Sequence, residues 1–330
     1  MERGPSRRTC LVGMAAGVLS MPYISRAHAA APIQLKFATA DTQQDKSYLV
    51  GERFGAEIAE KTGGKYKVQM YVGGALGSTV NIGSSLQTGI VDCAILTSGY
   101  IESLVPTVQV IDLPFIFKDE ASAAKILDGE VGQKLLADMA PKGIVGLSWG
   151  WYGWRQLELH DRVVKTPDDM HGLKIRIQPG PVFAAMFKQL GAIPIVLDGS
   201  EVYLALSQST VGAVDFPVPT AVTFKVYEVT KNLALTRHVY NAGALMVSKA
   251  LWGRLSPAER DIFKAAAVNV QPFWRQAVAD ATTDGMKFLT DHGMQATETD
   301  FAAFRAKMDP VYAQFRPKYQ ELFDKIMAQQ

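Results

Sequence analysis

Cysteine is scarce in this chain, which has only Cys10 and Cys93 among its 330 residues. Cys10 lies in an N-terminal segment that we expect to be removed, so Cys93 would have no partner for an intrachain disulfide. Cys93 stands in the apolar run 91–96, where a cysteine behaves as a small core residue. It has no basic neighbour and no helix start beside it that would lower its pKa. The sequence therefore predicts neither a disulfide nor a catalytic thiol.

Motifs that carry enzymatic chemistry are also lacking. None of the five histidines has metal-ligand spacing to a Cys, His or Glu partner. No Gly-x-Ser-x-Gly nucleophile turn occurs. Gly73, Gly74 and Gly77 have neither the lysine nor the spacing of a phosphate-binding loop. We therefore expect no enzyme, no cofactor and no metal site built from these motifs, while the sequence leaves open whether a metal ion assists ligand binding.

Charge of one sign is not in excess. The whole chain carries 34 basic and 32 acidic residues, and four of the basic and one of the acidic residues fall within 1–29. The remainder thus has 30 basic and 31 acidic residues, a net charge of −1. The slight basic excess of the full chain comes from the N-terminal segment, so it gives no support to nucleic-acid binding.

The first 29 residues have the features of a cleavable export signal. Basic residues precede an apolar run at 10–21, and the small-x-small sequence Ala27-His28-Ala29 follows it. The run is shorter than a membrane span requires, and no later segment approaches that length. The pair Arg7-Arg8 is also typical of twin-arginine signals, so the Sec and twin-arginine routes both stay open. We predict cleavage after Ala29 and a periplasmic location.

After the signal, strand and helix patterns alternate. The order strand–helix–strand–helix–strand occurs between 34 and 96 and again between 173 and 216. This order is typical of α/β sheets with mostly parallel strands, in which ligands bind beyond the carboxyl ends of the strands. We therefore predict two α/β lobes with a cleft between them. The predicted strands are 34–40, 67–72, 93–96, 173–177, 193–197 and 213–216, and the predicted helices are 45–61, 81–87, 181–190 and 201–207.

A long helix is predicted towards the C-terminus. Ser256-Pro257-Ala258-Glu259 is an N-cap followed by proline at the first helical position and an acid at the third. The helical pattern then continues to about residue 291, with Gly285 as its one weak point. Such a helix would be on the order of 50 Å long and could brace both lobes. Residues 301–327 carry apolar side chains at helical spacing, and we expect this stripe to pack onto its own lobe.

One arginine stands out within the predicted strands. In strand 173–177 apolar residues alternate with polar ones, and Arg176 lies near the carboxyl end. The planar guanidinium matches the two oxygens of a carboxylate. This segment alone leaves open whether Arg176 faces a ligand cleft or is a solvated surface residue.

Six short stretches, each weak alone, together carry a family pattern along the chain. They are 71–78, 86–92, 112–117, 153–155, 172–176 and 200–206. In this order they resemble the DctP-type solute-binding proteins of TRAP (tripartite ATP-independent periplasmic) transporters. The resemblance implies a two-lobed α/β fold, like that of type II periplasmic binding proteins, with an interlobe cleft and a bracing helix. It also implies capture of an organic acid and its delivery to integral-membrane TRAP permease subunits.

The resemblance assigns roles to two arginines. Arg176 occupies the position of the main carboxylate-binding arginine, and Arg155 matches a second family arginine. Beside Trp154, Arg155 could equally be a structural cation–π partner. Asp215 could pair with an arginine, bind a ligand hydroxyl or help to hold a cation. The predicted ligand-binding residues are Arg176, Arg155, Phe216, Asp215, Asn81, Trp154, Tyr100, Ser98 and Asp41.

Two departures from the family pattern bear on the ligand. The usual Gln-Glu-Asn-Pro reads Val214-Asp215-Phe216-Pro217, so Phe216 replaces an amide that commonly bonds the ligand carboxylate. Thr79-Val80-Asn81 stands where many members carry Glu-Arg-Glu. We infer a cleft suited to a partly apolar or aromatic acid. The alternative is that Phe216 packs within its lobe and another donor does the work of the amide.

The organisation of the chain follows from this resemblance. We expect lobe I to comprise 30–152 and 242–281, and lobe II 153–241 and 282–330. We expect a monomer, with a dimer through the C-terminal helix as the alternative, because some family members pair in that way. A periplasmic sensor subunit that presents its closed form to a receptor kinase is the alternative function, since its sequence would hardly differ.

Overall fold

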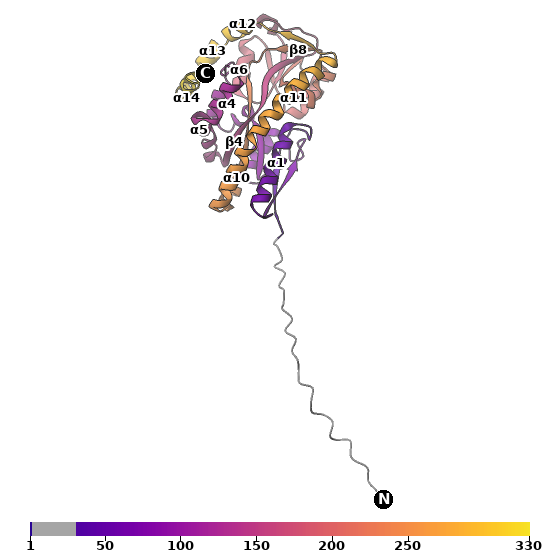
Figure 1. The fold of residues 1–330 in the computed structure, drawn as a ribbon. Coiled ribbons are helices and arrows are strands. Elements are labelled where there is room, and N and C mark those ends of the chain that lie inside the picture. Colours follow the sequence, from indigo (N-terminus) through magenta and orange to yellow (C-terminus); the bar gives the residue numbers. More distant parts are fainter. Residues whose placement is uncertain (2–30) are drawn as a thin grey trace. The chain divides into compact units, whose positions relative to one another are not determined.

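The computed structural model describes Met1 and residues 31–330. The expected export signal and its cleavage point therefore lie outside the described residues. Residues 32–330 form one unit, in which helices surround a mixed sheet of ten strands (Figure 1). The helices are α1 (Lys46–Lys61), α2 (Thr79–Thr88), α3 (Ser98–Ile101), α4 (Glu120–Asp128), α5 (Glu130–Ala137), α6 (Pro181–Gln189), α7 (Val202–Ser207), α8 (Val218–Thr223), α9 (Lys249–Arg254), α10 (Pro257–Asn269), α11 (Gln271–Asp291), α12 (Phe301–Ala306), α13 (Asp309–Phe315) and α14 (Gln320–Met327).

The sheet has two halves with similar topology. In the first half, β1 (Ile33–Ala38) lies parallel to both β2 (Tyr66–Tyr71) and β3 (Cys93–Thr97). In the second half, β5 (Lys174–Ile177) lies parallel to both β6 (Ile193–Val196) and β7 (Ala213–Pro217). Helices connect the parallel strands in each half, as crossover connections require. The two α/β stretches predicted from the sequence are therefore confirmed, and each predicted strand or helix within them ends within two residues of its prediction.

Two long strands join the halves. The 16 residues of β4 (Ile144–Leu159) pair antiparallel with β9 (Tyr240–Ser248) along the N-terminal part and with β7 and β8 (Asn232–Leu235) along the C-terminal part. β9 in turn pairs with β3, and β8 pairs with β10 (Gln295–Glu298). The sheet order is β2-β1-β3-β9-β4-β7-β5-β6. β4 therefore belongs to both halves of the sheet.

The prediction of one long helix is wrong in one respect. The helical segment is divided at Val270 into α10 and α11. Pro272 explains the division, because proline has no N–H and its ring clashes with the carbonyl four residues before it. Gly285 does not interrupt α11. It lies where the helix packs closely against Val218, since a Cβ there would lie 2.9 Å from Cγ1 of Val218. α11 runs along one side of the unit (Figure 1) and packs against α1 and α8.

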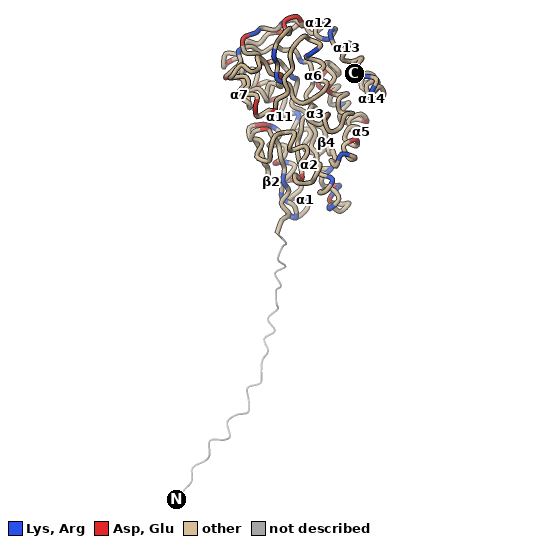
Figure 2. Tube along the Cα trace, turned by 180° about the vertical axis from the view of Figure 1, so that it is seen from behind, with Lys and Arg blue, Asp and Glu red and all other residues tan. Residues whose placement is uncertain are grey.

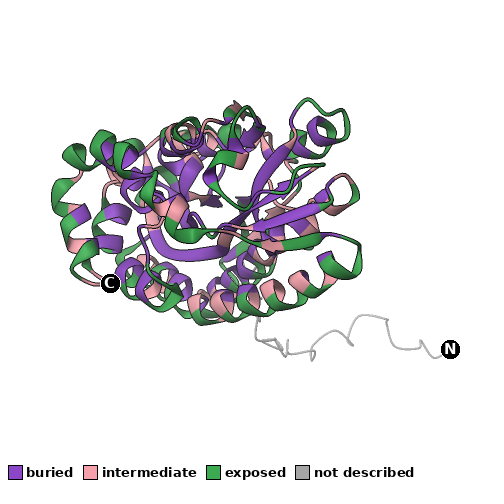
Figure 3. Ribbon diagram, turned by 90° about the horizontal axis from the view of Figure 1, so that it is seen from above, coloured by how far each residue is buried: buried purple, intermediate pink, exposed green. Residues whose placement is uncertain are grey.

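The core lies along the strands, which are largely buried while the outer helices are exposed on one side only (Figure 3). Cys93 is buried, as expected for a core residue, and burial raises the pKa of its thiol. The C-terminal stripe packs within the chain: α13 contacts α6, and the Tyr312 hydroxyl donates to the Pro114 carbonyl at 2.6 Å. Basic and acidic residues are interspersed along the trace (Figure 2). None of the helices in residues 31–330 has both the length and the apolar character needed to cross a membrane.

Candidate functional site

A cavity of about 50 Å³ lies between the two halves of the sheet, at the carboxyl ends of their parallel strands. The first half contributes the ends of β1 and β3 together with α3, and the second half contributes the ends of β5 and β7 together with α8. The charged lining residues are Arg155, Arg176 and Asp41. The aromatic lining residues are Tyr100, Tyr152, Phe216 and Phe224. The predicted location of the cleft is therefore the location of the cavity.

Arg176 is a buried cation, with 1% of its surface exposed. Its Nε donates to the carbonyl of Leu197 at 2.9 Å, and one terminal nitrogen donates to the Tyr100 hydroxyl at 3.0 Å. Its guanidinium carbon lies 5.3 Å from the centroid of the Phe216 ring. No carboxylate within residues 31–330 forms an ion pair with it. A buried charge without a counter-charge is unfavourable, so this site favours an anion.

Arg155 is also buried, but its charge is balanced. Its Nε donates to Oδ2 of Asp215 at 2.7 Å, and a terminal nitrogen donates to the main-chain carbonyl of the same residue. The second terminal nitrogen donates to Oδ1 of Asn241 at 3.1 Å. Although burial alone would raise it, the pKa of Asp215 is held below its usual value by Arg155 and by hydrogen bonding from His238. Of the three roles considered for Asp215, the geometry gives the pairing with an arginine.

Asp41 supplies the acid of the cavity. It lies in the loop after β1, and its Oδ2 accepts a hydrogen bond from the Tyr152 hydroxyl at 2.7 Å. Burial, followed by the negative charge of Asp41, raises the pKa of Tyr152 well above its ordinary value. The phenol therefore stays protonated and holds one oxygen of Asp41 in place.

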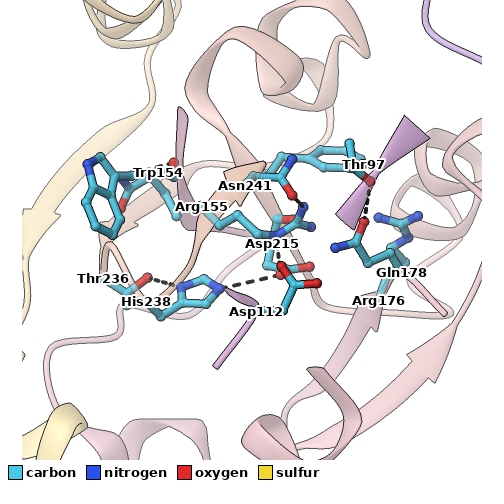
Figure 4. Close-up of polar contacts among 12 residues, drawn as sticks. Thr97, Asp112, Trp154, Arg155, Arg176, Gln178, Asp215, Thr236, His238 and Asn241 are labelled. Atoms are coloured by element: carbon cyan, nitrogen blue, oxygen red, sulfur yellow. Dashed lines mark hydrogen bonds and ion pairs between the residues drawn. The ribbon is translucent and has the colours of Figure 1, made fainter. Parts of the chain in front are cut away.

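A bulge in β4 decides which of its aromatic residues reach the cavity. The pairing of β4 with β9 shifts between Trp151 and Gly153, and Gly153 has a φ of +103°. Strict alternation would place Tyr152 and Trp154 on one face. Instead, Tyr152 and Arg155 line the cavity, while Trp154 packs against Tyr240 with ring centroids 4.9 Å apart. In Figure 4 the indole of Trp154 lies on the side of Arg155 away from Arg176.

Five of the nine predicted residues line the cavity, and four lie elsewhere. Arg176, Arg155, Phe216, Tyr100 and Asp41 line it. Asp215 and Trp154 lie behind Arg155, in the positions described above. Ser98 is fully buried, and its hydroxyl donates to Oδ1 of Asp112 at 2.5 Å. Asn81 is exposed on α2, where its backbone N–H donates to the hydroxyl of the N-cap Ser78 at 3.3 Å.

Several lining residues were missed by the sequence prediction. They include Thr97, Gln178, Phe224 and Asn241. Gln178 follows Arg176 by two residues, so strand alternation places both on one face and could have revealed it. The Thr97 hydroxyl donates to Oε1 of Gln178 at 2.9 Å (Figure 4). Phe224 and Asn241 come from distant segments, and no local pattern indicates them.

Direct hydrogen bonds join the two halves around the cavity. Besides the pairs Tyr100–Arg176 and Thr97–Gln178, the Ser103 hydroxyl donates to the Pro179 carbonyl at 2.6 Å. The Thr79 N–H donates to Oδ2 of Asp198 at 3.0 Å, and the Thr223 hydroxyl donates to Oδ1 of Asp45 at 2.9 Å. The cavity is therefore enclosed by protein on both sides.

Three further acids lie buried behind the lining. Burial raises the pKa of Asp112 to about 7, although Ser98 and Arg155 oppose the shift. Burial and then Asp112 raise the pKa of Glu102, and burial likewise raises that of Glu158, whose Oε2 accepts from the Phe216 N–H at 3.0 Å. None of the three lines the cavity. In residues 31–330 no group of three His, Cys, Asp or Glu side chains is arranged to hold a metal ion.

Comparison with known proteins gives a consistent result. The profile of DctP, the bacterial extracellular solute-binding proteins of family 7, matches residues 37–318. The 2,3-diketo-L-gulonate-binding periplasmic protein YiaO of Escherichia coli (strain K12) is 33% identical over 274 residues, which are 82% of this chain and 83% of YiaO.

Two solved structures are also similar to this chain. The first is a TRAP periplasmic solute-binding protein from Bordetella bronchispeptica, which is 35% identical and has a TM-score of 0.87. The match covers 90% of this chain and 99% of that chain, and the bound density in that structure was assigned to pantoate. A second, from Polaromonas sp. JS666, is bound to D-erythronate and is 32% identical with a TM-score of 0.88, over 89% of this chain and 98% of that chain.

Proposed function

This chain belongs to bacterial extracellular solute-binding protein family 7, the DctP family of TRAP solute-binding proteins, and we propose that it captures a compact organic acid through Arg176 and delivers it to a TRAP-type membrane permease. The family is one of transport proteins rather than enzymes. Capture takes place in the periplasm, where the expected export signal would direct the chain. Lobe I (30–152 and 242–281) and lobe II (153–241 and 282–330) close around the acid.

The observation that carries this proposal is the burial of Arg176 in the cavity wall, where no carboxylate of residues 31–330 pairs with it. A ligand carboxylate would supply the missing anion, and exclusion of water would strengthen the pair. Arg155 does not offer a second free charge, because Asp215 already balances it. A second ligand carboxylate would instead meet Asp41 inside the cavity. The charges thus favour a monocarboxylate, with Asp41 available to accept a hydrogen bond from a ligand hydroxyl.

Size and lining narrow the ligand further. A volume of about 50 Å³ has room for roughly four water molecules, at ~10–15 Å³ each. The ring of Phe216 lies against the guanidinium of Arg176, with Phe224 beside it at a centroid distance of 5.4 Å. We therefore propose a compact, partly apolar hydroxy acid. The acids reported for the two structural relatives, pantoate and D-erythronate, are both hydroxy acids, and pantoate is the partly apolar one.

The test is a binding measurement on protein that has been unfolded and refolded to remove bound ligand. Thermal shifts and calorimetry would be recorded with pantoate, D-erythronate, lactate, succinate and D-glucuronate. An acid at a hundred times its Kd adds about 2.7 kcal/mol of stability. In Arg176→Ala the binding free energy should fall by about 2–5 kcal/mol, because the buried carboxylate loses its partner.

The matched control is Arg316→Ala, which removes a surface arginine paired with Asp324 at 3.2 Å. This variant should bind like the wild type. Affinity in Arg176→Ala equal to that of the wild type would contradict the proposed role of Arg176. Absence of binding to every acid by the folded wild-type protein would contradict carboxylate capture itself.

A further inference from the structure

The Gln178 side chain presents an amide nitrogen for which residues 31–330 provide no acceptor. Gln178 directly follows β5 and stands two residues after Arg176, so both side chains leave the strand on the same face. Both line the cavity, and Gln178 is 2% exposed. Its Nε2 is buried and has no hydrogen-bond partner within residues 31–330. A buried donor without an acceptor is destabilising. In a cavity wall, an acceptor on a bound ligand would remove this cost.

Thr97 fixes the direction in which this amide points. The Thr97 hydroxyl donates to Oε1 of Gln178 at 2.9 Å. Since the carbonyl end of the amide is held by Thr97, the NH₂ end is turned away from it (Figure 4). The amide therefore has a defined orientation before any ligand arrives.

Other polar groups of the cavity do not serve as the acceptor. Oδ1 of Asn241 accepts from Arg155, Oδ2 of Asp41 accepts from Tyr152, and the Tyr100 hydroxyl accepts from Arg176. Each of these oxygens is thus engaged elsewhere, and none forms a hydrogen bond with Nε2 of Gln178. An acceptor that enters the cavity from outside remains as the partner.

Gly99 provides the space that this amide occupies. A Cβ at position 99 would lie 2.1 Å from Nε2 of Gln178, so any side chain there would force the amide to move. Gly99 lies in α3, on the opposite side of the cavity from β5, and its φ is not in the left-handed region. Its lack of a side chain is therefore explained by the close approach of Gln178 rather than by backbone conformation.

We propose that Gln178 is a second carboxylate-binding residue, which donates from Nε2 to one ligand oxygen while Arg176 donates to the other. Thr97 is the positioning residue that orients the amide. This inference rests on the proposed function, because the acceptor is the carboxylate of the captured acid. The amide adds direction without charge, so it helps to fix the plane of the carboxylate between β5 and α3.

The test compares three variants for binding of pantoate, D-erythronate and acetate to the refolded protein. Gln178→Met keeps the length of the side chain and removes the donor, and it should weaken binding by about 10- to 150-fold, the range for a hydrogen bond to a charged group. Thr97→Val frees the amide without removing it and should weaken binding about threefold to tenfold. Ser103→Ala removes a hydrogen bond between the halves that does not line the cavity, and it should stay within threefold of the wild type.

Gln178→Glu separates a ligand-binding role of Gln178 from a purely structural one, because only the former predicts that acid binding depends on pH in this variant. At pH 8 the new carboxylate would repel that of the ligand, so binding should be weaker than in Gln178→Met. As the pH falls towards 5, protonation of the glutamate should restore a donor, and binding should recover relative to the wild type at the same pH. A role limited to holding the halves together predicts no such recovery.

The outcomes separate this inference from the function on which it rests. If Gln178→Met binds with wild-type affinity while Arg176→Ala does not, Gln178 is not a carboxylate donor. The same conclusion follows if Thr97→Val loses as much affinity as Gln178→Met. If the wild type binds none of the three acids, the proposed function fails together with this inference. Should Gln178→Met not fold, Gly99→Ala displaces the amide from the other side and should weaken binding by at least tenfold.

Discussion

Arg155 and Asp215 form an ion pair inside the protein, with 2.7 Å between Nε and Oδ2 and with 2% and 0% of the two side chains exposed. The pair determines how many cations the cavity offers. With Arg155 balanced, Arg176 remains as the lining cation that a ligand carboxylate can neutralise. Under the proposed function, the pair would contribute to the choice of ligand although Asp215 itself does not line the cavity.

Removing the acid of this pair should have two effects. Asp215→Asn leaves the Arg155 charge buried without a counter-charge, which should lower the free energy of unfolding by about 3 kcal/mol. It also frees a second cation, so the affinity for succinate should rise relative to that for pantoate. Guanidinium denaturation and calorimetry would measure the two effects. Asp291→Asn, at an exposed site, is the control, and an unchanged ranking of the two acids would show that Arg155 does not sense the ligand.

Phe216 is expected to set the preference for apolar ligands. In Phe216→Asn the ring that covers Arg176 is replaced by an amide. The affinity for D-erythronate should therefore rise relative to that for pantoate by roughly fourfold, since each apolar methylene contact is worth about 0.8 kcal/mol. Calorimetry with both acids measures the ratio. If the ratio does not change, Phe216 packs within its own half and takes no part in ligand choice.

Asp45 should make stability depend on pH. Burial, followed by the charge of Asp41, raises its pKa to about 7 from an ordinary value of 3.8. Between these values the folded protein keeps a proton that the unfolded chain has lost. Stability therefore falls as pH rises through this interval, by at most about 1.4 kcal/mol per unit, and levels off above pH 7.

Thermal melts from pH 4 to 8 would test this dependence. Asp45→Asn should melt with a flatter pH profile and gain stability relative to the wild type at pH 8. Asp291→Asn should keep the wild-type profile. Because the pKa of Asp112 is also raised to about 7 by burial, part of the slope should remain in Asp45→Asn. A profile that does not differ from that of the wild type would exclude Asp45 as a source of the slope.

Gly285 should tolerate no side chain. Alanine favours helices by about 1 kcal/mol over glycine, yet Gly285→Ala would place a Cβ 2.9 Å from Val218 in α8. We expect a loss of about 1–3 kcal/mol from this overpacking. Gly253→Ala is the matched control, since nothing lies within 4 Å of a Cβ there, and it should be neutral or stabilising. Equal stability of the two variants would mean that α8 and α11 adjust without cost.

The strands and helices were predictable because their signals are local. Alternation placed Arg176 at the end of a buried strand, and glycine, proline and capping residues marked the helix ends. The break at Pro272 was equally visible in the sequence and was missed because the apolar pattern continues across it. The bulge at Gly153 was not visible, because it depends on how β4 pairs with β9. For the same reason Tyr152 was overlooked and Trp154 was selected.

Partners that are distant in sequence explain the remaining differences. Arg155 meets Asp215 because β4 and β7 are antiparallel and Arg155 lies opposite Pro217. No periodicity in either segment specifies that register. Asn241 and Phe224 reach the cavity by the same kind of long-range placement. The chemistry of Gln178 depends on Thr97, which lies 81 residues away.

The continuity of β4 also bears on how a ligand leaves. The 16 residues of β4 are shared by both halves. Separation of the halves would therefore require β4 and its hydrogen-bonded neighbours to twist, because no flexible linker replaces them there. The bulges beside Gly146 and Gly153 are the points where the ladder is already interrupted, so deformation should concentrate there. If the halves open and close as proposed, the stiffness of β4 should limit how far they separate. Substitutions that restore regular pairing at those bulges should therefore change the rate at which the acid is released, although they alter no group that contacts the acid.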